Sequence, residues 1–303
     1  MRPQDTYVNP LLTNVYITYG GDQNFVAEQI FKPLSVPKET GTYFTRDKEN
    51  LRAPADARRG MYARANRVTN TLSPTNYTLE EKSLEHWIPE RIMKQYADPF
   101  DAKKNGVQLI TDKLKLDQEI DARNSLQAGA GTSIDASAGW ANAATDIQAQ
   151  VSTASTAIQK ATGKKANTVV LSKDAVDAIL KNTAFRTAVQ YTSFPSPEEL
   201  RGKIASWLDV ENVIIADAVN NTAKEGQTDV LDYIWTDVAY VLYVNPNPAI
   251  DSTTAGYKLV LEDFAYSDEW YERGEKCDVV RVTDFYDNKV VDAGAIYRIF
   301  NVV

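Results

Sequence analysis

Three groups of neighbouring carboxylates are the side chains in this sequence best suited to chemistry. Paired carboxylates can exchange protons with a substrate, or hold Mg²⁺ through their oxygen atoms. Solvated strand edges and turns carry the same residues, so both interpretations stay open at this point. The groups are Glu80-Glu81, Asp268-Glu269, and Asp284 with Asp287.

Cysteine and histidine each occur once, as Cys277 and His86. A single copy of each excludes an intramolecular disulfide and every zinc site that needs several Cys or His ligands. Cys277 lies in a strand-like run, which favours a small buried side chain over a nucleophile. His86 precedes Trp87, and we interpret it as a packed or interfacial imidazole.

Short catalytic and cofactor-binding motifs are missing from the sequence. It contains no Gly-x-Ser-x-Gly, no dinucleotide fingerprint and no His-rich metal signature. The glycine-rich stretch Ala128–Thr132 lacks the Lys-Ser/Thr pair that completes a P-loop, so it is interpreted as a linker. We therefore expect no catalytic residue, no cofactor and no metal site. A carboxylate-dependent hydrolase remains the more distant alternative.

Charge is distributed unevenly along the chain. The formal net charge of −8 argues against a dedicated nucleic-acid binder, because phosphate contacts need a basic face. Residues 46–67 carry seven basic and three acidic side chains, whereas residues 262–292 carry four basic and ten acidic ones. Two opposite patches suit a subunit that docks on copies of itself, although each run alone could be solvated surface.

The first half of the chain predicts one long helix between extended segments. Residues 1–40 are interrupted by proline and glycine and have too little periodic apolar sequence for a core, so they read as an extended arm with a short helix near residues 25–31. Strand-like runs at residues 42–46 and 76–80 flank a polar, arginine-rich stretch. This pattern predicts a projecting hairpin that needs a partner from outside. Asp98-Pro99 supplies an N-cap and a first-turn proline for a helix that the apolar spacing carries to about Gln127.

The second half mixes helices and strands, which makes the class α+β. The expected helices cover residues 145–161, ending at Gly163, a segment capped by Ser172, and a segment opened by a capping box at Ser196. The expected strands cover residues 167–171, 213–216, 238–244, 257–264, 279–285 and 295–302. No apolar run approaches the roughly 18 residues that span a bilayer, and no signal-peptide pattern opens the chain. We therefore expect a protein that stays in the cytosol.

In their joint order these segments resemble the HK97-type major capsid proteins of tailed double-stranded DNA bacteriophages, along nearly the whole chain. The resemblance implies an HK97-like capsid fold with an N-terminal arm, an extended E-loop hairpin, a long spine helix, and peripheral and axial domains. The segments that carry it are Phe31-Lys32-Pro33 with Val36, Gly41-Thr42-Tyr43-Phe44, Tyr77-Thr78-Leu79 with Ser83-Leu84-Glu85, residues 163–171, Ala216-Asp217-Ala218 with residues 222–226, and residues 278–282.

The same resemblance implies five regions. They are the arm over residues 1–40, the E-loop hairpin over 41–88, the peripheral domain with the spine helix over 89–164, the axial domain over 165–250, and strands that complete both domains over 251–303.

The function implied by the resemblance is structural and not enzymatic. The chain would self-assemble into pentamers and hexamers of an icosahedral head, which encloses double-stranded DNA without sequence-specific binding. Its expected partners are its own copies, a portal protein, and a decoration or cement protein. The arm begins at Met1 without the long scaffolding segment of the familiar family member, which implies a separate scaffolding protein or none. Its expected location is the virion capsid, and the host cytoplasm during assembly. An encapsulin-like nanocompartment shell is the nearer alternative.

The arginines of the hairpin are the expected contacts between subunits. A segment without its own aliphatic core cannot be ordered by its own contacts, so a neighbour must cover it. The leading candidate for the acidic partner is residues 262–292 of that neighbour, and the arm would reach another subunit. The arginines are Arg46, Arg52, Arg58, Arg59, Arg64 and Arg67.

Overall fold

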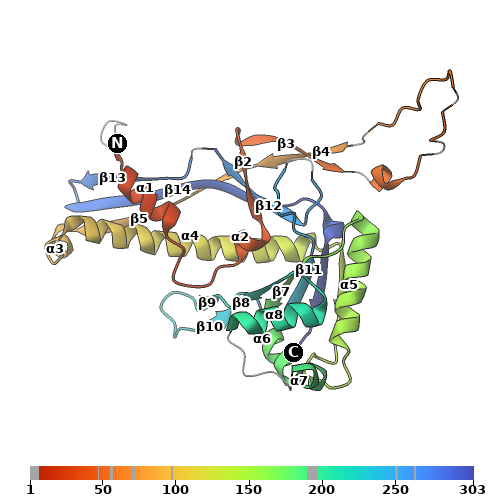
Figure 1. Cartoon of the computed structure of the whole chain (residues 1–303). Helices are drawn as coiled ribbons and strands as arrows, with labels where there is room; N and C mark the ends of the chain where they lie inside the picture. Colours follow the sequence, from red (N-terminus) through yellow and green to blue (C-terminus); the bar gives the residue numbers. More distant parts are fainter. Residues whose placement is uncertain are drawn as a thin grey trace.

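A computed structural model describes residues 7–46, 48–54, 57–59, 61–69, 72–96, 98–189, 197–249, 252–262 and 264–303, without the side chains of Tyr7, Arg46, Asn50 and Pro197. It shows a long helix under an elongated sheet, a second body below the helix, and a hairpin that projects from the sheet (Figure 1). Among the described residues, no helix is long and apolar enough to cross a membrane. Ser196, predicted to cap a helix, lies outside the residues that the structure describes.

Helix α4, Pro99–Gly129, is the longest element of the chain at 31 residues, or about 45 Å. The Asp98 carboxylate accepts a hydrogen bond from the Phe100 amide at 2.9 Å, which confirms the predicted start. Gly106 does not break the helix. A Cβ atom there would lie 3.0 Å from the His86 ring and 3.1 Å from Val280, so the glycine lets the helix approach the sheet closely.

The elongated sheet is built around one strand, β14, Cys277–Val290. Along one of its edges run β13, Tyr266–Glu272, and then β12, Gly256–Leu261; along the other runs β5, Glu80–Pro89. Short outer strands complete it, with β1, Tyr7–Val8, on β13 and β2, Lys32–Val36, on β12. Apolar side chains of β14, β5, α1 and α4 meet on one face, where Leu12, Val107, Ile110 and Val280 are buried.

The arm folds against its own subunit. Asn9 caps helix α1, Pro10–Thr18, and the short helix α2 covers Ala27–Ile30, within the predicted segment. The expectation that the arm contributes no core is wrong for the described residues. Its apolar side chains are few, but elements from elsewhere in the chain bury them in two clusters; the buried residues are Leu12, Val26, Ala27, Ile30 and Phe31.

The second body contains a five-stranded mixed sheet in the order β6-β15-β11-β7-β8. Strands β7 and β11 are buried along their whole length, as expected for central strands covered on both faces. The strands are β6, Thr132–Asp135; β7, Thr168–Ser172; β8, Asn212–Ala216; β11, Val238–Leu242; and β15, Ile296–Phe300.

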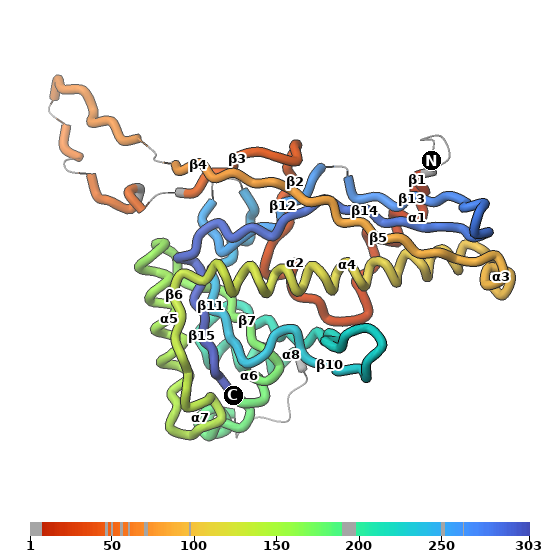
Figure 2. Tube along the Cα trace, turned by 180° about the vertical axis from the view of Figure 1, so that it is seen from behind, coloured from red at the N-terminus to blue at the C-terminus, as the bar shows by residue number. Residues whose placement is uncertain are grey.

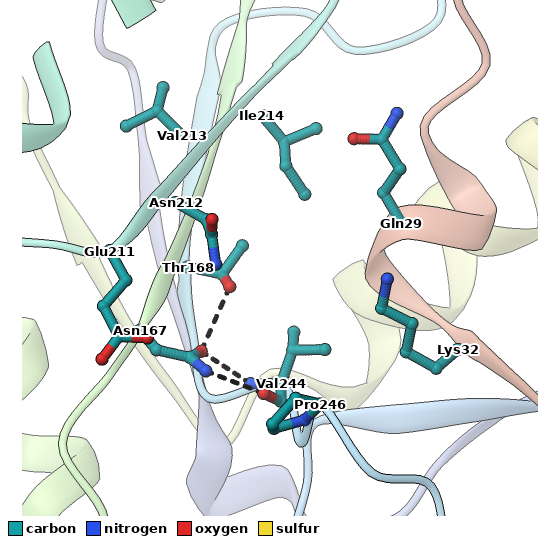
Figure 3. A pocket seen from close by; sticks show the side chains of 10 residues that line it. All are labelled: Gln29, Lys32, Asn167, Thr168, Glu211, Asn212, Val213, Ile214, Val244 and Pro246. Carbon is teal, nitrogen blue, oxygen red and sulfur yellow. Dashed lines mark hydrogen bonds between the residues drawn. The ribbon is translucent and has the colours of Figure 1, made fainter. Parts of the chain in front are cut away.

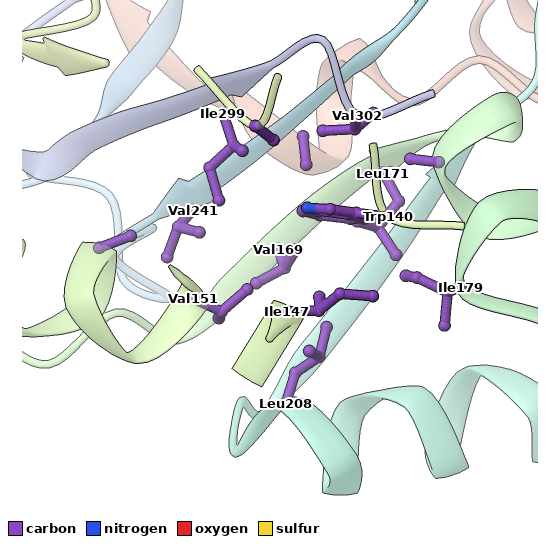
Figure 4. Packing of buried hydrophobic residues seen from close by; sticks show 14 of the residues in the cluster. Trp140, Ile147, Val151, Val169, Leu171, Ile179, Leu208, Val241, Ile299 and Val302 are labelled. Atoms are coloured by element: carbon purple, nitrogen blue, oxygen red, sulfur yellow. The ribbon is translucent and has the colours of Figure 1, made fainter. Parts of the chain in front are cut away.

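Helices cover one face of this sheet. Figure 4 shows the cluster that results, with Trp140 among aliphatic side chains of the sheet and of the helices. Gly163, at a φ of 75°, ends helix α5 where the sequence predicted. The opposite face packs against the arm and the C-terminal half of α4. The helices are α5, Ile147–Thr162; α6, Lys173–Lys181; α7, Thr183–Val189; and α8, Pro197–Leu208.

Two further pieces complete the chain. A two-stranded hairpin leaves the second body beside α8 and α4, formed by β9, Val219–Asn221, and β10, Leu231–Tyr233 (Figure 2). The short helix α3 covers Glu90–Met93, and a 3₁₀ turn covers Ala293–Ala295.

The projecting hairpin pairs β3, Thr40–Arg46, with β4, Leu72–Thr78, in antiparallel register, as the sequence predicted. Gly41 lies opposite Tyr77, and a Cβ atom there would come within 2.5 Å of the Tyr77 hydroxyl, so only glycine leaves room for this ring. Tyr77 and Tyr43 are buried against β12 at the base of the hairpin. The predicted strand at residues 76–80 is in fact the junction of β4 and β5, because β5 joins the elongated sheet.

Candidate functional site

The arginine-rich loop lies at the far end of the hairpin, away from both sheets (Figure 1). Arg52 pairs with Glu49 at 3.4 Å, and Arg59 donates a hydrogen bond to the Ala63 carbonyl at 2.7 Å. Arg58, Arg64 and Arg67 are exposed, and the Arg46 side chain lies outside the described residues. The loop therefore keeps a surplus of positive charge on its surface.

Large apolar side chains are exposed beside these arginines. Met61, Tyr62 and Val68 are 87%, 95% and 83% exposed. Leaving such groups in water forgoes about 1.5–3 kcal/mol each relative to full burial. The sequence analysis stressed the charge of this loop and missed its apolar tip, although Met61-Tyr62 stands out among the small and charged residues around it.

Leu51 ties the near half of the loop to its own subunit. A 3₁₀ turn, Lys48–Leu51, follows β3 and brings the Leu51 side chain over Gly163, at the end of α5. A cavity of about 470 Å³ lies between them, lined in part by Lys48, Lys164 and Asp292. The near half of the loop is thus held from within the subunit, whereas the far half is not packed by this contact.

The acidic run at residues 262–292 is largely engaged inside the subunit. Arg281 donates two hydrogen bonds to the buried Asp268 carboxylate, of 3.0 and 2.5 Å, and also forms an ion pair with Glu85. Further ion pairs join Lys103 to Glu269 and Asp278, and Lys289 to Asp287. Among the carboxylates of the run that the structure describes, Glu262, Glu272, Glu275 and Asp292 show no salt bridge. Asp292 instead accepts a hydrogen bond from the Gly294 amide at 2.8 Å.

The other candidate chemical groups are also structural. The Asp284 carboxylate is buried, accepts a hydrogen bond from the Tyr16 hydroxyl at 2.9 Å and lies 3.8 Å from the Lys258 ammonium. Burial raises the pKa of the Cys277 thiol, and His86 packs over Gly106 as the sequence predicted. Among the residues described, no cluster of three or more His, Cys, Asp or Glu side chains could hold a metal ion.

A cavity of about 350 Å³ lies beside the starts of β7 and β8 (Figure 3). The Asn167 side-chain amide, on one wall of the cavity, donates to the Val244 carbonyl at 2.8 Å and accepts from the Val244 amide at 2.9 Å, and so continues the strand pairing of β7 with β11. The Asn167 side chain is therefore already used by the fold itself. Gln29 and Lys32 of the arm form its opposite wall.

The face of the elongated sheet turned away from α4 presents aromatic side chains. Trp87 of β5 and Trp270 of β13 lie directly opposite Val279 of β14, one on each side of it. The Arg281 guanidinium lies 5.0 Å from the centre of the Trp270 ring. Trp87 is 56% exposed. Aromatic and arginine side chains of this kind are typical of protein interfaces.

No family model and no curated protein sequence matches this chain. Solved structures do match it over almost its whole length. A phage-related protein from Bordetella bronchiseptica RB50 is 19% identical, covers 97% of each chain and has a TM-score of 0.78. The capsid of cyanophage P-SCSP1u is 10% identical, with coverage of 93% of this chain and 91% of that chain and a TM-score of 0.59.

A third match is an encapsulin. The holo-SrpI encapsulin complex from Synechococcus elongatus PCC 7942 is 14% identical, with coverage of 92% of this chain and 88% of that chain and a TM-score of 0.52. At these identities the likeness concerns the fold. The α+β, HK97-like capsid fold expected from the sequence is thereby confirmed.

Proposed function

We propose that this chain is the major capsid protein of a tailed double-stranded DNA bacteriophage, which assembles into pentamers and hexamers of an icosahedral head. The observation that carries the proposal is the match to a cyanophage capsid over 93% of this chain and to an encapsulin over 92% of it. A partial match would leave room for a different protein built on one shared domain. A subunit of this fold acts by geometry, through contacts between copies that close on themselves.

The projecting hairpin supports assembly independently of the comparisons. Its tip exposes Met61, Tyr62 and Val68 together with a cluster of arginines, and a second copy can cover both kinds of side chain at once. We keep Arg46, Arg52, Arg58, Arg59, Arg64 and Arg67 as the proposed contacts between subunits. Because most of the acidic run is already paired, the acidic partners reduce to its exposed carboxylates, such as Glu262 and Glu275, and those of β5, such as Glu81.

The remaining parts of the proposal follow from a phage head. The subunit would reside in the virion, assemble in the host cytoplasm, and meet a portal protein, a decoration or cement protein, and either a separate scaffolding protein or none. A net charge of −8 suits a container that encloses DNA without gripping it. The five-part division at residues 1–40, 41–88, 89–164, 165–250 and 251–303 stays a prediction.

An encapsulin-like shell is the second candidate, because the SrpI encapsulin shares the fold. The two candidates differ in what the shell contains. Negative-stain electron microscopy of the purified chain tests both, since each requires closed particles of uniform size. A monomer or dimer without particles, at protein concentrations up to about 1 mM and with added scaffold, would overturn both.

Co-purification then separates the two candidates. A phage head should package DNA when it is produced together with the portal and terminase proteins encoded nearby. A nanocompartment should instead retain one enzyme encoded beside it, and should require no portal. Retention of a stoichiometric enzyme cargo would overturn the phage assignment while leaving the shell standing.

A further inference from the structure

The arm makes a sharp turn beneath α4, at residues 23–27, and meets the base of the β9–β10 hairpin there (Figures 1 and 2). The Gln23 side-chain oxygen accepts a hydrogen bond from the Val219 amide at 2.7 Å. The Asn24 amide donates to Asp217 at 2.9 Å and to the Ile215 carbonyl at 3.2 Å. The arm thus binds the chain where it enters the hairpin.

Glu119 of α4 binds the arm and the other leg of the same hairpin. One of its carboxylate oxygens accepts hydrogen bonds from the Val26 amide at 2.9 Å and the Ala27 amide at 2.8 Å. The other oxygen accepts from the Trp235 indole nitrogen at 2.6 Å. Trp235 follows β10, and the neighbouring Ile234 amide closes the hairpin base on the Ala218 carbonyl at 2.9 Å.

The Glu119 carboxylate is completely buried, and in each of its three hydrogen bonds to the arm and to Trp235 it is the acceptor. Glu119 is 0% exposed and Trp235 is 1% exposed. Bonds of this kind to a buried ionised group are stronger than ordinary ones, and losing the acceptor strands every donor that it serves. Arm and hairpin therefore share one acceptor, so the position of either depends on the other.

We propose that the arm turn and Glu119 together set the direction of the β9–β10 hairpin, so that the docking of the arm is transmitted to this projecting element. The hairpin exposes Val230 and Leu231 at 54% and 71%, which is the kind of side chain that a second copy covers. Its use as a contact between copies rests on the proposed function. The coupling itself is a property of the single subunit.

Hydrogen exchange measured by mass spectrometry on the unassembled subunit tests the coupling in both directions. Gln23→Ala changes only the arm, and we expect amides of residues 219–233 to exchange about ten-fold faster or more. Trp235→Phe keeps an aromatic side chain but removes the indole N–H donor together with part of the ring volume, and we expect faster exchange at residues 22–31. Trp140→Phe, in the other core cluster, is the matched control. It loses the same volume at an equally buried site, together with an indole N–H that donates to Gln150 at 2.8 Å, and it should change neither segment.

Glu119→Gln should affect both segments at once, because an amide cannot accept from donors on both of its sides. Asp117→Asn on the same helix is the matched control, since its exposed carboxylate pairs with Lys82 and does not touch the arm. If Gln23→Ala leaves the hairpin unchanged and Trp235→Phe leaves the arm unchanged, the coupling is refuted, even if Glu119→Gln fails to fold.

Electron microscopy of the same variants tests whether the β9–β10 hairpin is a contact between copies. Gln23→Ala should give fewer or misshapen particles if the hairpin is a contact between copies. Regular particles in a variant whose hairpin amides exchange fast would refute the role of the hairpin as a contact between copies. The coupling between arm and hairpin within one subunit would still stand. Absence of particles from the wild type would instead count against the proposed function.

Discussion

Gly256 marks the point where the arm crosses the start of β12. A Cβ atom there would lie 2.4 Å from the Phe31 ring and 2.6 Å from the Lys289 carbonyl, and the ring is completely buried. We expect Gly256→Ala to destabilise the subunit by about 1–3 kcal/mol, because the backbone or the ring must move. Urea unfolding of the subunit measures this. Gly202→Ala is the control, since Gly202 lies inside α8 with open space around it and should gain up to about 1 kcal/mol.

The ion pair between Arg281 and Asp268 differs from the other pairs near it because one partner is buried. The Asp268 side chain is 2% exposed. We expect Arg281→Ala to cost about 3 kcal/mol in free energy of unfolding, since it strands a buried carboxylate. Lys289→Ala removes a pair whose partners are both more exposed, and should cost less than about 1 kcal/mol. Equal effects of the two changes would show that burial does not set the cost.

Glu119 also predicts a pH dependence. Burial raises the pKa of its carboxyl group, and the hydrogen bonds from Ala27, Trp235 and Val26 only partly offset this. The folded subunit then holds the proton more tightly than the unfolded chain does, so the contribution of Glu119 to stability falls as pH rises above the ordinary glutamate pKa of about 4.3. The free energy of unfolding of the wild type, minus that of Glu119→Gln, should decrease from about pH 4.5 to pH 7. A flat or rising difference would contradict this sign.

At the scale of elements, the arm is a structural part of the subunit. Removing residues 1–37 takes away β2 and uncovers the clusters that bury Leu12, Ile30 and Phe31. We expect this deletion to give insoluble or unfolded protein, since burying one large apolar side chain contributes about 1.5–3 kcal/mol. Among the described elements, removing residues 1–8 takes away only the two-residue strand β1, so that protein should stay soluble. Circular dichroism and gel filtration distinguish the two results.

Elements with strong local signals could be predicted from the sequence. Asp98-Pro99 and Gly163 fixed the start of α4 and the end of α5, because caps depend on a few adjacent residues. The arm could not be judged in this way. Its buried residues are too sparse to form a periodic pattern, and their burial comes from elements more than 80 residues away. Strand β5 was attributed to the hairpin because an alternating pattern shows that a strand has a buried face, but not which strand pairs with it.

At the scale of the whole molecule, the loop at residues 47–71 should act through its charge and its apolar tip together. Replacing Arg58, Arg59, Arg64 and Arg67 by alanine should weaken assembly and make it more sensitive to salt, while the unfolding of the subunit stays unchanged. Light scattering at low and high salt measures the assembly. A control that removes the same charge from other exposed positions, Lys104, Lys113, Lys160 and Lys181, should have a smaller effect. Equal effects would show that net charge matters and the loop does not.

The acidic side of this contact could not be predicted from the sequence. A run of carboxylates reads as an acidic surface until the fold brings cations beside it. Lys103 reaches Glu269 and Asp278 from α4, far away in the sequence, and Arg281 reaches Asp268 from the neighbouring strand. The fold, by contrast, followed from the order of the elements, which the sequence does carry.

Strand β14 has a mechanical consequence for the shell that we propose this chain forms. It pairs with β5 along one edge and with β13 and β12 along the other, and α4 runs beneath it for much of its length (Figure 1). A pull along the strand direction loads the hydrogen bonds of these ladders together, in shear, whereas a pull across the sheet would open them one after another. Tension in the shell wall along α4 should therefore be carried by many bonds at once. In single-molecule stretching, a subunit held at Cys277 and Glu80, at opposite ends of the β14–β5 ladder, should yield at a higher force than one held at Cys277 and Pro89, at the same end.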